Sequence, residues 1–154
     1  MATPSNLKNI QRILVGVDGS EKSIAALRWA AHLAAQVGAE VEVATTWQTP
    51  FPTIELLAIG FDLDLTELNE RPLQIAQYRI EKSIVGAYGE PSPIGVARSV
   101  EEGYPALVLV EKSKKFDLLV LGNRGHSPLL ETLLGSVSLH CLAYSHCPVV
   151  IVKE

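Results

Sequence analysis

Hydrophobic and polar positions are grouped along the chain in a pattern that predicts five strands. Nearly continuous apolar runs cover residues 12–17, 116–121 and 149–152, a segment rich in Val and Thr covers 40–47, and a weaker run covers 94–100. Runs of this length are typical of strands that are buried on both faces of a parallel sheet. The runs are separated by longer segments with a different periodicity, which predict the helices.

These intervening segments carry apolar residues at helical spacing. Ser20 suits the N-cap of a first helix, which Gly38 ends. A second helix is expected over residues 65–88, with Pro72 marking an early break or a restart. A third helix is expected over residues 106–114 and is opened by a proline near its first position.

The chain therefore alternates strands and helices, which favours an α/β fold with a parallel sheet between two helical layers. Five strands suit a flavodoxin-like (Rossmann-like), doubly wound sheet, in which ligands bind beyond the carboxyl ends of the strands. We expect a single domain over residues 1–154, with a polar N-terminal extension over 1–10. Residues 49–64, which include two prolines, are expected to form a long, variable loop.

The composition limits the classes of partner and location. The chain of 154 residues is 47% hydrophobic and 19% charged, has a net charge of −4 and contains no polybasic run. Binding to nucleic acid or to an anionic membrane through bulk charge is therefore not expected. No apolar stretch is long enough to span a bilayer, and residues 1–11 lack the apolar core of a signal peptide, which predicts a cytoplasmic protein. Cys141 and Cys147 lack metal-ligand spacing and are expected to be reduced structural thiols.

Glycines follow the fourth predicted strand at a fixed spacing. Gly122 and Gly125 come directly after the strand, and Gly135 precedes Ser136 inside a helix predicted over residues 128–144. The backbone N–H groups of such a loop can turn outward and let a phosphate approach without an obstructing side chain. The alternative is that Gly122 and Gly125 only make a tight strand-to-helix turn and that Gly135 allows close helix packing. The pattern is neither a P-loop, because no Gly-Lys-Ser/Thr ends it, nor a G-x-G-x-x-G dinucleotide fingerprint.

Polar residues near these glycines are candidates for ligand contacts. Asp18, at the end of the first strand, could contact a ribose hydroxyl or a nucleotide-bound Mg²⁺ through water, or could only turn the chain. Arg124 and His126 lie in the glycine loop and could contact a phosphate or remain exposed without a ligand role. Ser138 could add a hydroxyl donor beside Ser136. No Ser-His-Asp or Cys-His arrangement and no paired carboxylates suggest catalysis.

From about residue 11 to residue 152, the chain resembles the universal stress protein family. The resemblance is carried by residues 13–20 (ILVGVDGS), 102–105 (EGYP), 117–125 (DLLVLGNRG), 134–138 (LGSVS) and 147–152 (CPVVIV). The spacing G-x2-G-x9-G-(S/T), which is the ATP-binding signature of that family, is complete in this chain.

The resemblance implies a sheet of strand order 3-2-1-4-5 that binds ATP, or alternatively ADP, AMP or cyclic AMP. Asp18 would contact the ribose region or a Mg²⁺ ion carried by the nucleotide, and the backbone near Thr46 would meet the adenine. The glycines would lie under the ribose and the phosphates. The nucleotide-binding residues implied in this way are Val17, Asp18, Thr46, Leu121, Gly122, Arg124, Gly125, Gly135, Ser136, Val137 and Ser138.

Members of the family commonly pair the last strand with its copy in a second subunit, which implies an antiparallel homodimer through residues 149–152. An exposed apolar edge strand is a hazard unless it is paired, so physical reasoning points the same way. A protein partner of unknown identity is also expected.

Three functions remain open at this point. The leading hypothesis is an ATP-binding regulatory switch of the stress response rather than an efficient enzyme. The second is a slow ATPase or phosphotransferase, although the sequence offers one aspartate, one loop arginine and no P-loop lysine. The third is a nucleotide-free dimeric interaction module, against which the intact glycines argue. We expect Gly122→Val or Gly135→Glu to abolish nucleotide binding while the fold persists, because each change fills the space for phosphate.

Overall fold

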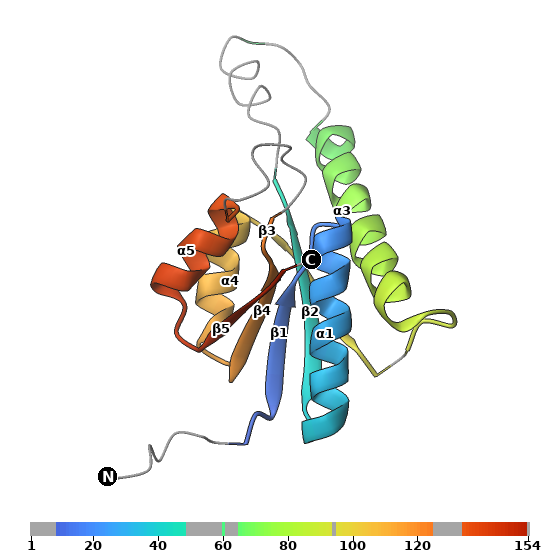
Figure 1. Ribbon diagram of the computed structural model, residues 1–154. Coiled ribbons are helices and arrows are strands. Elements are labelled where there is room, and N and C mark those ends of the chain that lie inside the picture. Colours follow the sequence, from blue (N-terminus) through green and yellow to red (C-terminus); the bar gives the residue numbers. More distant parts are fainter. Residues whose placement is uncertain (1–8, 49–59, 61–64, 94, 125–133, 154) are drawn as a thin grey trace.

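Five parallel strands form one sheet in the order β3-β2-β1-β4-β5 in the computed structural model, with helices on both faces (Figure 1). The structure describes residues 9–48, 60, 65–93, 95–124 and 134–153. The strands are β1 (Arg12–Gly16), β2 (Glu40–Trp47), β3 (Ala97–Glu102), β4 (Leu118–Gly122) and β5 (Val149–Val152), and the helices are α1 (Glu21–Val37), α3 (Leu65–Tyr88), α4 (Pro105–Ser113) and α5 (Ser136–Tyr144). This arrangement confirms the flavodoxin-like α/β class and the strand order 3-2-1-4-5.

Two helical layers cover the sheet. α1 and α3 pack on one face, and α4 and α5 pack on the other (Figure 1). Successive residues of β1 therefore enter different cores, because side chains alternate between the faces of a strand. Ile13 and Val15 belong to the cluster under α1 and α3, whereas Leu14 packs in the cluster that contains Leu109 of α4 and Cys141 of α5. Among the described helices, none is both long and apolar enough to cross a membrane.

Several predicted helix ends are confirmed. The Ser20 hydroxyl caps α1 by accepting a hydrogen bond from the N–H of Ser23 at 3.3 Å. Gly38 ends α1 in the left-handed conformation, at φ 73°, where a residue without a Cβ is favoured. α4 begins with Pro105 at its first position, as expected. The thiols of Cys141, which is buried, and Cys147, which is half-buried, are both free.

The last helix begins later than the hydrophobic pattern predicts. α5 starts at Ser136, and Gly135 is its N-cap in an extended conformation, with φ −65° and ψ 158°. The N–H of Gly135 donates to the carbonyl of Asn123 at 2.9 Å, which holds this part of the chain against the end of β4. The third glycine therefore precedes the helix instead of lying inside it. The predicted helical residues 128–133 lie outside the described residues.

Two further boundaries differ from prediction. β3 begins at Ala97 and ends at Glu102, because its register follows β2 up to the pair of Trp47 with Glu102. α3 continues through Pro72 without a break. The buried apolar residues described in this helix recur at intervals of four, and their packing on the sheet compensates for the hydrogen bond that proline cannot donate. The predicted loop over residues 49–64 lies outside the described residues, apart from Gly60.

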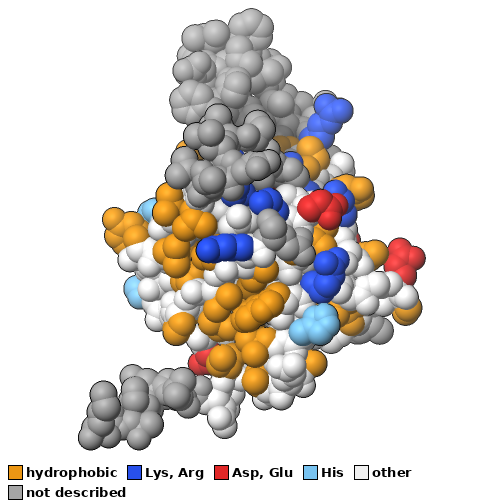
Figure 2. All heavy atoms as spheres, in the orientation of Figure 1, with side chains coloured by type: hydrophobic (Ala, Val, Ile, Leu, Met, Phe, Trp, Pro, Cys, Tyr) orange, Lys and Arg blue, Asp and Glu red, His pale blue; other side chains and the backbone are white. Residues whose placement is uncertain are grey.

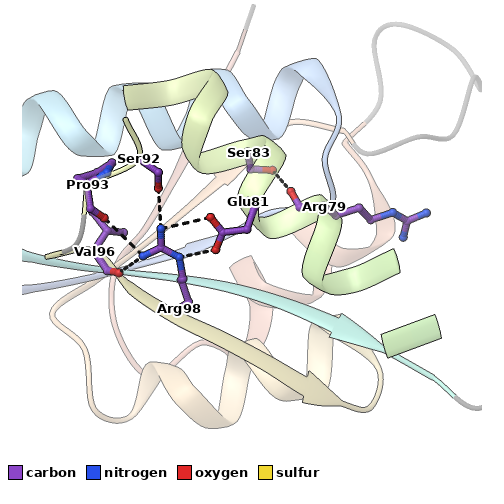
Figure 3. Close-up of polar contacts among 7 residues, drawn as sticks. All are labelled: Arg79, Glu81, Ser83, Ser92, Pro93, Val96 and Arg98. Carbon is purple, nitrogen blue, oxygen red and sulfur yellow. Dashed lines mark hydrogen bonds and ion pairs between the residues drawn. The ribbon is translucent and has the colours of Figure 1, made fainter. Parts of the chain in front are cut away.

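Arg98 of β3 fastens α3 to the edge of the sheet (Figure 3). Its Nε lies 2.5 Å from Oε1 of Glu81 on α3, and its Nη2 donates to the hydroxyl of Ser92 at 2.6 Å. Its Nη1 donates to the carbonyl of Val96 at 2.7 Å. One guanidinium thus joins the helix, the connection after it and the strand. These bonds fix the position of the part of α3 that carries Arg79.

Candidate functional site

A cavity of about 310 Å³ lies at the carboxyl ends of β1, β2 and β4. Every predicted site residue that the structure describes lines this cavity, whereas Gly125 lies outside the described residues. Those lining residues are Val17, Asp18, Thr46, Leu121, Gly122, Arg124, Gly135, Ser136, Val137 and Ser138. The fold therefore brings together three chain segments that are far apart in the sequence.

The cavity also contains residues that sequence reasoning missed. They are Gly16, Ser23, Ala44, Thr45, Arg79, Pro105 and Leu109. Gly16 is a small residue at the end of β1, and this is a signal that could have been used; Ala44 is its partner within β2. Arg79 has no such signal, because an exposed arginine on an amphipathic helix is ordinary.

The start of α5 supplies backbone donors to the cavity. The first helical hydrogen bond runs from the N–H of Leu139 to the carbonyl of Gly135 at 3.0 Å. The N–H groups of Ser136, Val137 and Ser138 therefore have no acceptor within the helix. No acidic residue occupies this first turn. Together with the helix dipole, these donors make this end of the cavity suitable for an anion.

The hydroxyl of Ser138 has a different role from the one expected. It donates to the carbonyl of Gly122 at 2.8 Å, and the bond is buried. The hydroxyl hydrogen is therefore engaged inside the protein and is not offered to a ligand. Ser138 fixes the first turn of α5 on the end of β4, so its contribution to the cavity is positional.

Gly122 is required for the contact between β4 and α1. A Cβ at this position would lie 2.8 Å from the carbonyl oxygen of Lys22 and 2.9 Å from its carbonyl carbon. Both atoms belong to the backbone, so they cannot move as a side chain would. Close packing is therefore found at Gly122, where the sequence suggested only a tight turn as the alternative to phosphate binding. The expectation that Gly122→Val leaves the fold intact has to be corrected.

Asp18 organises the turn that leads from β1 into α1. Its Oδ1 accepts a hydrogen bond from the N–H of Ser20 at 2.9 Å, and its own N–H donates to the hydroxyl of Ser23 at 3.3 Å. The turn-forming interpretation thus holds, and the same residue also lines the cavity. Within the described part of the chain, no group of three or more His, Cys, Asp or Glu residues could hold a metal ion.

The peptide groups of Thr46 point toward the cavity. In a parallel sheet, successive residues direct their N–H and C=O groups to opposite neighbouring strands. The carbonyl of Ala44 accepts from Val17, on the side of β1, at 2.9 Å. The carbonyl of Trp47 accepts from Gly103, on the side of β3, at 2.9 Å. Thr46 therefore faces the side of β1 beyond the last residue of that strand, and no described residue is hydrogen-bonded to its peptide groups there.

The charge of the cavity favours an anionic ligand. Among the described lining residues, the formal charges are those of Asp18, Arg79 and Arg124, which sum to +1. The positive groups add to the N-terminal dipole of α5. The cavity can therefore bind an elongated molecule that carries hydrogen-bonding groups at the β2 end and negative charge at the α5 end.

Comparisons with known proteins show which family the chain resembles. The sequence model of the universal stress protein family matches residues 9–153. A universal stress protein of Mycolicibacterium smegmatis is 33% identical over 91% of the chain, which spans only 47% of that relative. One from Methanocaldococcus jannaschii is 32% identical over 94% of the chain and 82% of the relative. A universal stress protein solved in complex with cAMP is 27% identical, with a TM-score of 0.62 over 94% of this chain and 98% of that one.

Proposed function

The chain belongs to the universal stress protein family, and from this premise we propose that it binds an adenine nucleotide, ATP or a close relative. The observation that carries the proposal is the cavity itself. It joins the outward-facing peptide groups of Thr46 to the N–H groups at the start of α5, which have no acceptor within the helix. The complex of a related protein with cAMP supports the same ligand class.

The dimensions of the cavity suit a nucleotide. β1 separates β2 from β4, so the two ends of the cavity are about 10 Å apart, which is two strand spacings. We propose that the adenine lies at the Thr46 end and the phosphates at the α5 end. The volume of about 310 Å³ is at the lower limit of typical ligand sites.

A magnesium ion fits this site only as a companion of the nucleotide. Asp18 is the single carboxylate among the described lining residues. Mg²⁺ in proteins is commonly bound through one or two carboxylates together with substrate phosphates and water. We therefore propose that the phosphates of ATP and water supply most of its ligands.

We propose a binding protein that acts as a regulatory switch of the stress response, rather than an efficient enzyme. Phosphoryl transfer requires strong charge stabilisation and a positioned nucleophile. The described lining residues include no lysine, no histidine and no second carboxylate. A switch, by contrast, requires only that two states of the protein differ in nucleotide affinity.

We also propose a homodimer formed through β5. The carbonyls of Pro148 and Val152 accept from β4 and from the residue directly after it, so Val149 and Ile151 direct their peptide groups to the open edge of the sheet. Apolar side chains gather over α5 and β5 in Figure 2, and Leu139 and Leu142 of α5 are exposed. Antiparallel pairing of two copies would cover this edge. The free thiols suit a reducing compartment, and we propose the cytoplasm.

Calorimetric titration of ATP, ADP, AMP and cyclic AMP into protein stripped of nucleotide tests the proposed ligand. Ser136→Pro tests the contribution of a single backbone donor, because proline at the first helical position removes one N–H without breaking the helix. The extended conformation of Gly135 is one that tolerates a following proline. We expect ATP to bind about tenfold more weakly to this variant, as one charge-assisted hydrogen bond is lost. Ser136→Ala, which retains the N–H, is the matched control. Absence of binding by all four nucleotides would overturn the proposal.

A further inference from the structure

One residue of α3 reaches the cavity without any assigned role. Arg79 is the α3 residue that lines the cavity among those the structure describes, and its side chain is exposed. Figure 3 shows this side chain pointing away from the contact between Arg98 and Glu81, in the direction in which β2 and β3 run. Its guanidinium has no hydrogen bond or ion pair with another described residue. A planar cation therefore stands beside the cavity with its donors available to a ligand.

The position of Arg79 is fixed by the turn after β1. Gly19 in this turn has φ +82°, and a Cβ built on it would lie 3.2 Å from Cγ of Arg79 and 3.5 Å from its Cβ. The aliphatic stem of the arginine thus lies against the bare backbone of Gly19. On the other side, Glu81 is held by Arg98 two residues further along α3. The ion pair anchors the part of α3 that carries Arg79, and Gly19 supports the stem, while the guanidinium extends beyond both contacts.

The neighbours of Arg79 place it at the β2 end of the cavity. A second hollow of about 390 Å³ adjoins the first, and the two share Thr46, Arg79 and Pro105. The second hollow has apolar walls that include Trp47 and Ile75. The start of α5 lies at the opposite end, about 10 Å away across β1. Arg79 is therefore grouped with the peptide groups of Thr46 and not with the N–H groups of α5.

We propose that the guanidinium of Arg79 stacks on the aromatic base of the bound nucleotide and selects for a planar base. This inference rests on the proposed function of the same cavity. Arginine stacks on aromatic faces because its charge is spread over a flat, weakly hydrated group. A base whose edge meets the backbone of Thr46 leaves a face open toward α3. Arg79 would cover that face and restrict the exchange of water with the site.

The test compares Arg79→Ala and Arg79→Lys in calorimetric titrations with adenosine, AMP and ATP. Stacking on the base predicts a loss of affinity of roughly three- to tenfold that is equal for the three ligands. Lysine should not restore affinity, because it lacks the planar group. Arg71→Ala is the matched control, since Arg71 is an exposed arginine of the same helix that lines neither cavity. Urea unfolding should show unchanged stability for the three variants.

Other outcomes would overturn the inference in distinguishable ways. A loss that grows from adenosine to ATP and is reversed by lysine would make Arg79 a phosphate contact. Unchanged affinity in Arg79→Ala would remove it from the site altogether. A wild-type protein that binds none of the three ligands would overturn the proposed function, and this inference with it.

Discussion

The hydroxyl of Ser138 donates a buried hydrogen bond of 2.8 Å to the carbonyl of Gly122 and thereby joins the start of α5 to the end of β4. Replacing Ser138 by alanine leaves this carbonyl without its partner. We expect Ser138→Ala to lower the free energy of unfolding by about 1–2 kcal/mol. Urea unfolding measures the change, and Ser136→Ala is the control because Ser136 is exposed. Equal stability of Ser138→Ala and wild type would contradict the structural role of the bond.

Gly122 and Gly16 provide a comparison of two crowded glycines. A Cβ on Gly122 would meet backbone atoms of Lys22 at 2.8 and 2.9 Å. A Cβ on Gly16 would meet side-chain methyl groups of Leu121 at 2.7 Å and Leu109 at 2.9 Å. Methyl groups can rotate away, whereas the backbone of α1 cannot.

We therefore expect Gly122→Ala to lower the free energy of unfolding by about 2–3 kcal/mol and Gly16→Ala by only about 1 kcal/mol. Denaturant unfolding of both variants under the same conditions checks the order. If Gly16→Ala proves the more damaging change, the distinction between backbone and side-chain crowding fails here. If the expected order holds, loss of nucleotide binding in Gly122→Val reports altered packing as well as the site.

Lys112 of α4 lies between Glu42 of β2 and Glu101 of β3, with its Nζ 2.7 Å from a carboxylate oxygen of each. Hydrogen bonds from Lys112 and Ser99 lower the pKa of Glu101 below its usual value of 4.5. Burial alone would lower the pKa of Lys112, but its hydrogen bonds to Glu101 and Glu42 raise it overall. The ionised network is therefore favoured in the folded state.

The pH dependence of stability follows from the directions of these pKa shifts. A lowered pKa in the folded state means that Glu101 stabilises the protein above the pKa of the unfolded chain, and that this contribution is lost as pH falls through the folded pKa. Lys112→Met leaves two carboxylates without their cation. We expect it to lower the free energy of unfolding at pH 7 by about 1–3 kcal/mol, between the values for exposed and for buried pairs.

The difference in free energy of unfolding between Lys112→Met and wild type should shrink as pH falls through the lowered pKa of Glu101, because protonation neutralises that carboxylate. Urea unfolding of both proteins at a series of pH values measures this difference in free energy. A difference that stays constant with pH would show that the lysine acts through the packing of its stem.

The proposed dimer can be tested at the open edge of β5. The N–H of Ile151 faces away from β4, so Ile151→Pro removes a donor from the pairing edge and none from the sheet itself. We expect this variant to sediment as a monomer, whereas Ile151→Val should sediment as a dimer. Sedimentation velocity over a range of protein concentrations separates the two. A dimer of unchanged stability in the proline variant would place the interface elsewhere.

The sequence predicts the strands and most helix ends because their signals are local. Apolar runs identify the buried strands, and Ser20 and Gly38 act on their own helix. The start of α5 could not be found in this way, because the apolar spacing continues upstream of Gly135, whereas the extended conformation depends on Asn123. The hydroxyl of Ser138 and the side chain of Arg79 depend on partners that only the folded sheet brings near.

The backbone of Asn123 is hydrogen-bonded through both its N–H and its carbonyl. Its N–H donates to the carbonyl of Val152 at 3.1 Å, and its carbonyl accepts from the N–H of Gly135 at 2.9 Å. One residue thus connects the proposed dimer strand with the N-cap of the helix proposed to hold the phosphates. Binding free energies at linked sites are reciprocal. If a bound nucleotide stabilises the dimer through Asn123, dimerisation strengthens nucleotide binding by the same free energy. The concentration of the protein would then affect how tightly it holds its ligand.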